Sequence, residues 1–326
     1  MSAVKSFDIN SSTYAGELSL PYIAPAILAA DSIANGYITL KENVKYKAVL
    51  KKLSGGTIIA AGCDFDSTAG SMDLDEVILT VTDLMINEQI CKKDFRQDWE
   101  AMQTGRGFIN DQLPPNFEAF LLQYLAAKVA EAIEKNTWHG DYNETDGSTS
   151  GGNAVTAFNG ILAKIVAGTP GAETLVAGAF TPDALAATGI LTHLSTVVNN
   201  APSVIQSNPN SVIYMSKKSL FLLQRAMAGL LVTSGAYSPT FVGENRPTTY
   251  LGFPILTPSG FPNDTLVFSY TANFYFGTDL TSDFNEAVVV DMTRTDASDN
   301  VRLAMRFCGG AQVGHLGDVS VVRRSS

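Results

Sequence analysis

The sequence predicts an α+β fold in which strands and helices are segregated along the chain, without regular βαβ repetition. Three observations support this class. Two alternating segments flank a long connection of small and acidic residues at 54–72. One long amphipathic stretch covers 117–136, and the second half of the chain contains short strand-like segments with Gly/Pro turns.

Residues 1–43 are predicted to form an N-terminal arm. The stretch LSLPYIAPAILAADSIANGYI is apolar, but Pro21 and Pro25 interrupt it and it lacks a sustained helical period. An apolar, irregular terminal segment must pack on another surface to stay ordered. We therefore expect the arm to dock.

Residues 44–82 are predicted to form a long β-hairpin. Even-numbered positions from Val44 to Leu50 are apolar, whereas the odd-numbered positions between them carry lysine or valine. The returning strand, 72–85, begins with acidic residues, so we expect cross-strand charge contacts. A two-stranded hairpin alone is marginally stable in water. We expect it to rest on another surface, that of a neighbouring subunit.

A charged helix is predicted from Cys91 to Met102, and the longest helix over 117–136. Apolar side chains recur through the longer stretch at helical spacing up to Ala132 and Ile133, and Gly140 is expected to end it in the left-handed conformation. A buried strand, NSVIYM, and a helix begun by Ser216 follow. Two further strands, EAVVVDMTR and VRLAMRFCGGAQV, are predicted close to the C-terminus.

Composition indicates an oligomer. Charged residues make up 17% of the chain, below the ~25% of an ordinary soluble domain, as expected where neighbouring subunits cover much of the surface. The net charge of −10 argues against a protein whose whole surface binds nucleic acid. No signal peptide or apolar run of membrane-spanning length is visible, so no membrane partner is expected. The cysteines, Cys63, Cys91 and Cys308, are far apart and are expected to be free thiols.

The common catalytic motifs are missing from the sequence. It contains no G-x-S-x-G, no G-x-x-x-x-G-K-[ST] and no H-E-x-x-H. Acidic residues between Asp64 and Glu76 lack the glycine and terminal glutamate of a known calcium loop, which favours a solvated hairpin tip. We therefore predict no enzyme activity and no catalytic, cofactor or metal residues. The alternative from another class is a hydrolase that uses Ser216 or Ser234 with His193.

From about Asp83 onward the chain resembles the major capsid proteins of tailed bacteriophages, which have the Hong Kong 97-type fold. The resemblance lies in the order of four pieces; residues 1–82 match by anatomy only, as an arm followed by an extended loop. The pieces are the helix 117–136 ending in TWHGD, then FNGILAKIV, VIYMSKKSLFLLQRAM and YLGFPILTPSGFPNDTLVFSYTANFYFG.

The resemblance implies a division of the chain. It comprises an N-terminal arm (1–43), an extended loop hairpin reaching over the adjacent subunit (44–82), a peripheral domain (83–174) with its spine helix, an axial domain (175–285) and return strands of the peripheral domain (286–326). It implies a subunit that self-assembles as hexamers and pentamers into an icosahedral shell around double-stranded DNA. Such a protein is a virion component assembled in the host bacterial cytoplasm. An encapsulin-type nanocompartment shell protein is the alternative of the same fold.

Two sets of residues are candidate contacts. We expect Lys45, Lys47, Lys51, Lys52, Asp73 and Asp75 to contact another subunit, and Arg323 and Arg324 to face packaged DNA without reading its bases. The expected partners are further copies of the chain, a portal and a separate scaffolding protein. Many relatives begin with a scaffolding region that a protease removes, whereas this sequence begins almost at the arm, so the alternative to a separate scaffold is a chain that has already been trimmed. No cofactor is expected.

Overall fold

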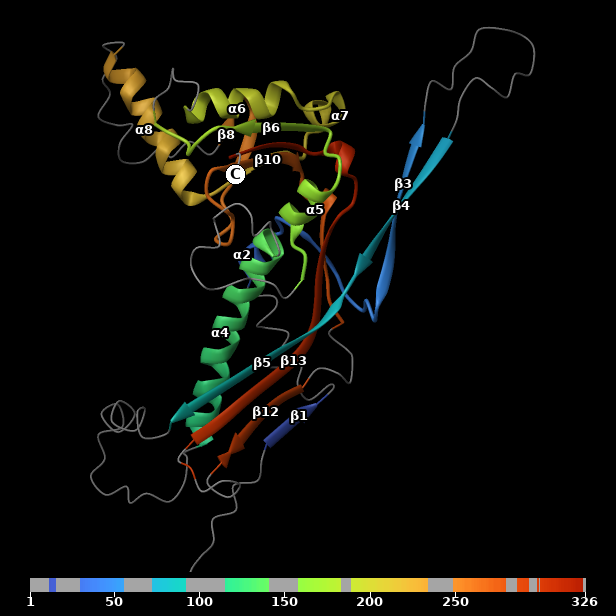
Figure 1. Cartoon of the computed structure of the whole chain (residues 1–326), viewed down its shortest axis with the longest axis vertical. Coiled ribbons are helices and arrows are strands. Elements are labelled where there is room, and N and C mark those ends of the chain that lie inside the picture. The colour runs from blue at the N-terminus through green and yellow to red at the C-terminus, as the bar shows by residue number, and fades with distance from the viewer. Residues whose placement is uncertain are drawn as a thin grey trace, which may run out of the picture.

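A computed structural model describes residues 12–15, 30–55, 72–91, 115–140, 158–182, 189–233, 249–279, 286–292, 298 and 300–324. These residues form two six-stranded sheets, a separate two-stranded hairpin and helices that pack on the sheets (Figure 1). The predicted mixed α+β class is confirmed.

The first sheet is built around one long strand, β13 (Asn300–Val313). Along the sheet the order is β1 (Ser12–Ala15), β12 (Glu286–Asp291), β13, β11 (Phe274–Gly277) and β2 (Thr39–Lys41), and β5 (Thr82–Cys91) also pairs with β13. Alternate residues of β13 point into the core, because a strand directs successive side chains to opposite faces.

Strand β5 overturns the predicted start of a helix at Cys91. The hairpin's returning segment continues as strand through Cys91, which lies opposite Asn300 of β13. Leu84, Ile86 and Ile90 pack against the core from this strand. Ladder pairing along most of β13 and burial of these side chains therefore outweigh the helical character of the charged sequence. The rest of the predicted helix, 92–102, lies outside the described residues.

The second sheet has the order β6 (Ala172–Val176), β14 (Ser320–Arg324), β10 (Thr265–Tyr270), β7 (Ser211–Met215), β9 (Phe253–Leu256) and β8 (Thr249–Tyr250). Every residue of β7 is buried, as its apolar sequence predicts. Ile213 and Met215 belong to a cluster with helices α6 (Ile190–Asn199) and α8 (Lys217–Thr233), whereas Val212 and Tyr214 join the larger core on the other face.

Helix α8 begins where predicted, after Ser216, whose Oγ accepts a hydrogen bond from the backbone N–H of Ser219 (3.1 Å). The last strand, β14, lies in a different sheet from the other two strands of 286–326. It pairs with β6 and β10 in the second sheet, although β12 and β13 belong to the first. Its position is fixed by burial, because Val321 and Val322 point into the two different cores.

Helix α4 (Pro115–His139) contains the predicted long helix. Val129, Ile133 and Trp138 are buried, whereas Ala132, expected on the same stripe, is exposed. The predicted left-handed end at Gly140 is wrong, because its φ is not among the positive values. Gly140 is needed for close packing instead: a Cβ there would collide with the carbonyl oxygen of Phe158, which precedes helix α5 (Ile161–Ala167).

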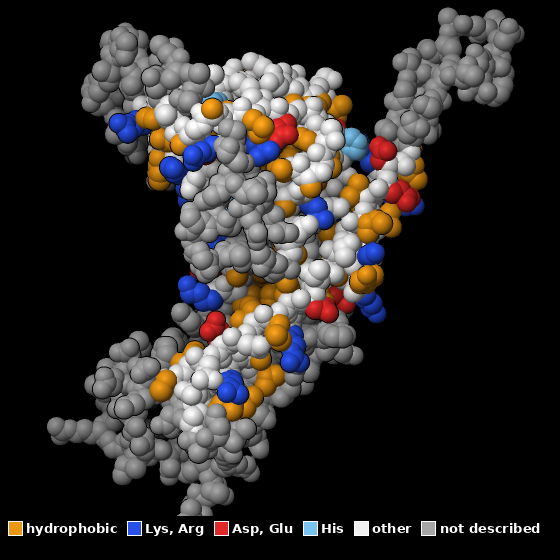
Figure 2. Space-filling view, in the orientation of Figure 1, with side chains coloured by type: hydrophobic (Ala, Val, Ile, Leu, Met, Phe, Trp, Pro, Cys, Tyr) orange, Lys and Arg blue, Asp and Glu red, His pale blue; other side chains and the backbone are white. Residues whose placement is uncertain are grey.

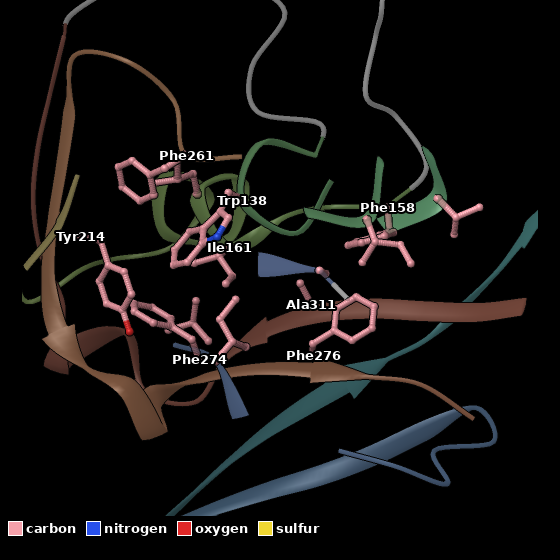
Figure 3. Close-up of a cluster of buried hydrophobic side chains, with 14 of the residues drawn as sticks. Trp138, Phe158, Ile161, Tyr214, Phe261, Phe274, Phe276 and Ala311 are labelled. Atoms are coloured by element: carbon pink, nitrogen blue, oxygen red, sulfur yellow. The ribbon is translucent and has the colours of Figure 1, made fainter. Parts of the chain in front are cut away.

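The largest core lies between the two sheets and joins them. Trp138 is fully buried, and its ring centroid lies 5.1 Å from that of Tyr214, 5.1 Å from that of Phe261 and 5.8 Å from that of Phe274 (Figure 3). These partners come from β7, from the turn before β10 and from β11. One indole therefore holds the end of α4 against strands of both sheets.

A buried polar contact attaches helix α2 (Asp31–Ala34) to α4. The Glu134 carboxylate accepts hydrogen bonds from the Ser32 backbone N–H (2.9 Å) and hydroxyl (2.5 Å), and Trp138 Nε1 donates to the same hydroxyl (2.7 Å). Burial raises the pKa of Glu134, and the hydrogen bonds from Ser32 offset only part of this effect.

Trp138→Ala is expected to lower the free energy of unfolding by about 4 kcal/mol, because it leaves a cavity between the two sheets. The matched control is Phe221→Ala on α8, where the aromatic side chain is 61% exposed. That control should change stability by only a few tenths of a kcal/mol. Urea denaturation of the purified variants measures both, and equal losses would contradict this account of the core.

Glu134 is expected to make stability depend on pH. Its folded-state pKa is raised, so the folded chain holds a proton more tightly than the unfolded chain does. Stability should therefore fall as pH rises from about 4.3, the unfolded value, through the folded pKa, and this contribution should be constant above it. Glu134→Gln should remove this part of the pH slope in urea denaturation. If the dependence of stability on pH were unchanged in Glu134→Gln, a group other than Glu134 would bind the proton.

Candidate intersubunit interface

Strands β3 (Lys47–Gly55) and β4 (Met72–Thr80) form an antiparallel hairpin that projects from the body of the molecule (Figure 1). The predicted pairing of these segments is confirmed, with Lys47 opposite Thr80 and Leu53 opposite Leu74. The connection at 56–71 lies outside the described residues. Opposite residues share a face, so the hairpin presents two chemically distinct faces.

The base of the hairpin is packed on the first sheet. Val44, Leu79, Val81 and Cys308 form a small buried cluster at this point. Val81 lies between β4, which pairs with β3, and β5, which pairs with β13. The returning chain thus changes its pairing partner at this one residue.

The inner face of the hairpin contacts its own chain. Ala48 and Leu50 are half-buried near the base. Farther out, Lys52 Nζ donates to Asp318 Oδ2, and Asp75 Oδ2 lies 3.5 Å from His315 Nε2. Both partners belong to the loop that joins β13 to β14.

The outer face of the hairpin consists of Val49, Lys51, Leu53, Leu74, Glu76 and Ile78, all exposed. Val49 lies opposite Ile78, and Leu53 lies opposite Leu74. Between these two apolar pairs, Lys51 Nζ is 3.1 Å from Glu76 Oε1. The expected cross-strand charge contact is therefore present, although an exposed ion pair contributes little to stability. The four apolar side chains are 50% to 64% exposed. Figure 2 shows hydrophobic side chains interspersed with charged ones along the projecting hairpin.

The structure divides the six predicted contact residues between these surfaces. Lys51 lies on the outer face, whereas Lys52 and Asp75 face their own chain. Lys45 and Lys47 are exposed near the base, and Lys47 Nζ lies 5.0 Å from the ring centroid of Tyr46. Asp73 pairs with Ser54. A contact between any of these residues and another subunit remains a prediction.

Sequence reasoning missed the four apolar residues of the outer face. Val49 lies among lysines at the odd-numbered positions of the first strand, and acidic residues dominate the start of the returning strand. The signal that could have found them is the pairing register. Once Leu53 lies opposite Leu74, the side chains of Leu74 and Ile78 must point to the same side of the hairpin as Lys51.

The two candidate DNA-facing arginines, Arg323 and Arg324, lie at the end of β14, between β6 and β10 in the second sheet. Arg323 Nε lies 2.7 Å from Glu173 Oε1 on β6, so its charge is compensated within the chain. Arg324 is exposed, and its backbone N–H donates to the Asp264 carbonyl oxygen (3.1 Å). A role of either residue toward DNA remains a prediction.

The residues of the hydrolase alternative have structural contacts. Ser216 Oγ lies 3.1 Å from Ser219 Oγ and accepts the α8 cap bond, and both serines are buried. His193 is buried, with its ring centroid 4.5 Å from that of Phe180. A cysteine thiol is another group that could act as a nucleophile. Burial and the adjacent Asp83 carboxylate raise the pKa of the Cys308 thiol to about 12. Ser234 lies outside the described residues.

The described residues contain neither a metal-binding cluster nor a membrane-spanning helix. No three His, Cys, Asp or Glu side chains gather there as a metal-binding group. No helix in that part of the chain is both long enough and apolar enough to cross a membrane.

No protein-family model and no curated protein matches the sequence. Solved structures do match over nearly the whole chain. A chain of the satellite phage P4 procapsid, a particle that includes the size determination (Sid) protein, is 12% identical with a TM-score of 0.57, covering 99% of this chain and 94% of that one. The capsid of an empty GTA particle gives 13% identity and a TM-score of 0.56, covering 91% and 90%.

A chain from Gordonia phage Cozz gives 11% identity and a TM-score of 0.52, covering 91% of this chain and 87% of that one. The chain therefore has the fold of a phage major capsid protein.

Proposed function

We propose that this protein is the major capsid protein of a tailed double-stranded DNA phage and that it assembles as hexamers and pentamers into an icosahedral shell around the genome. The observation that carries the proposal is the outer face of the hairpin. Its apolar side chains are exposed on a ribbon whose opposite face is already held by its own chain. The likeness to capsid chains over nearly their whole length supports the same role.

A second copy of the chain is the partner that fits this face. Val49, Leu53, Leu74 and Ile78 expose apolar area that contributes roughly 25 cal/mol per Å² when it is removed from water. In a closed ring each subunit gives one hairpin and receives another, so a modest contact is repeated around the ring. Stability of the shell then arises from many such contacts.

The remaining assignments follow from this role. The protein acts mechanically, without catalysis, as a component of the virion assembled in the host bacterial cytoplasm. A separate scaffolding protein and a portal guide closure of the shell. Packaged DNA is contacted without sequence specificity, and the exposed Arg324 is one candidate for a phosphate contact.

The double variant Leu53→Ser/Leu74→Ser is expected to fold normally but fail to form closed shells, because it removes the apolar pair of the outer face that lies farthest from the base. Circular dichroism checks folding and negative-stain electron microscopy counts particles. Lys51→Gln is the matched control, since it removes a charge from the same face and leaves the apolar side chains in place. Normal particles from the double variant would refute docking through this face.

Replacing residues 55–72 by Asn-Gly tests the extended hairpin separately. The two-residue turn should preserve the pairing of Ser54 with Asp73 and the register of the remaining ribbon. We expect a soluble, folded protein that does not close shells, because the shortened hairpin can no longer reach the neighbour. Size-exclusion chromatography with light scattering measures the assembly, and wild-type particle mass would contradict the expectation.

A further inference from the structure

Four side chains join the hairpin to the body away from its base. Lys52 and Asp75 lie opposite each other on the inner face of the hairpin. The Asp318 carboxylate accepts hydrogen bonds at Oδ2 from Lys52 and from the Tyr270 hydroxyl (2.9 Å). His315 lies between the two acids, with Nδ1 3.4 Å from Asp318 Oδ1 and Nε2 3.5 Å from Asp75 Oδ2. We call Lys52, Asp75, His315 and Asp318 the latch.

The body half of the latch is held rigidly. Asp318 is 4% exposed, and its carbonyl oxygen accepts a hydrogen bond from Ser269 Oγ (2.6 Å). Asn273 accepts from the His315 N–H (2.7 Å) and donates to the His315 carbonyl oxygen (3.0 Å). Burial and the Asp318 carboxylate raise the pKa of Tyr270, so its hydroxyl remains a donor. The carboxylate is therefore oriented by the body before Lys52 reaches it.

The position of the latch gives it leverage over the hairpin. The ribbon ends at its base where Lys47 lies opposite Thr80, the last residue of β4, and the returning chain changes its pairing partner at the next residue, Val81. Lys52 lies on β3 five residues beyond Lys47. At ~3.3 Å per strand residue, the latch acts about 17 Å from that end of the ribbon. A contact so far from the base restrains the angle of the whole hairpin.

The latch and the base differ in the cost of breaking them, and at the base Gln312 Nε2 also donates to the Ile78 carbonyl oxygen (2.9 Å). Leu79 and Val81 at the base are buried, so separating them would expose apolar surface. The latch consists of polar side chains, and the Lys52 side chain is 33% exposed. When the latch opens, water can hydrogen-bond to the side chains of Lys52 and Asp75 in place of their partners on the body. The base therefore behaves as a pivot and the latch as a releasable contact.

We propose that the latch holds the hairpin in one orientation and can open while both strands and the base remain folded, so that the hairpin swings about Val81. Closing it satisfies the buried Asp318 carboxylate with the Lys52 ammonium, and opening it frees the inner face beyond Leu50. This is a property of the single chain and does not depend on shell formation.

Pulsed electron paramagnetic resonance on the full chain tests the proposal. Spin labels at Leu53→Cys on the hairpin and Val204→Cys on α7 (Ser203–Ser207) are both at exposed positions. The background carries Cys63→Ser, Cys91→Ser and Cys308→Ser, and unlabelled protein dilutes any contacts between copies. A single narrow distance distribution is expected for the closed latch.

Lys52→Met should lose that narrow distribution, because the hairpin samples several angles once the latch is broken. Lys51→Met is the matched control: the neighbouring lysine pairs with Glu76 within the hairpin, on the opposite face, so the narrow distribution should remain. Asp75→Asn should broaden the distribution less than Lys52→Met does. An unchanged distribution in Lys52→Met, or equal broadening in Lys51→Met, would overturn the proposal.

Discussion

A two-stranded ribbon has two faces, and this chain covers only one of them. The inner face of the β3–β4 hairpin rests on its own body through Lys52 and Asp318, while the outer face leaves four aliphatic side chains exposed. A ribbon of this kind is at best marginally stable alone in water. The requirement for a second surface connects the local alternation of the sequence with the proposed assembly of many copies.

The body supplies the rigidity that such a ribbon needs. Strand β13 pairs with β5 along most of its length, and β5 continues directly into the hairpin. The shared core around Trp138 fixes both sheets and the end of α4 to each other. Gly310 has no side chain where β13 meets the Thr80 carbonyl oxygen, so the hairpin base can approach closely. Packing in the body thus fixes where the base of the hairpin lies.

Much of this could be predicted from local patterns. Period-two alternation predicted the hairpin, helical spacing predicted α4, and Ser216 marked the start of α8. Cys91 was misassigned because pairing with β13 is a long-range contact that no local pattern contains. The roles of Lys52 and Asp75 depend on His315 and Asp318, which are more than two hundred residues away in the sequence. The charges were visible, but their partners were not.

High-resolution electron cryomicroscopy of the purified, assembled protein tests the central claim most directly. The outer face of each hairpin, including Leu53 and Leu74, is expected to lie against an adjacent copy, while Asp318 of the same chain still lies beneath the inner face of that hairpin. A shell in which these leucines face solvent would contradict this expectation. A particle in which the outer face packs on its own chain would contradict it equally.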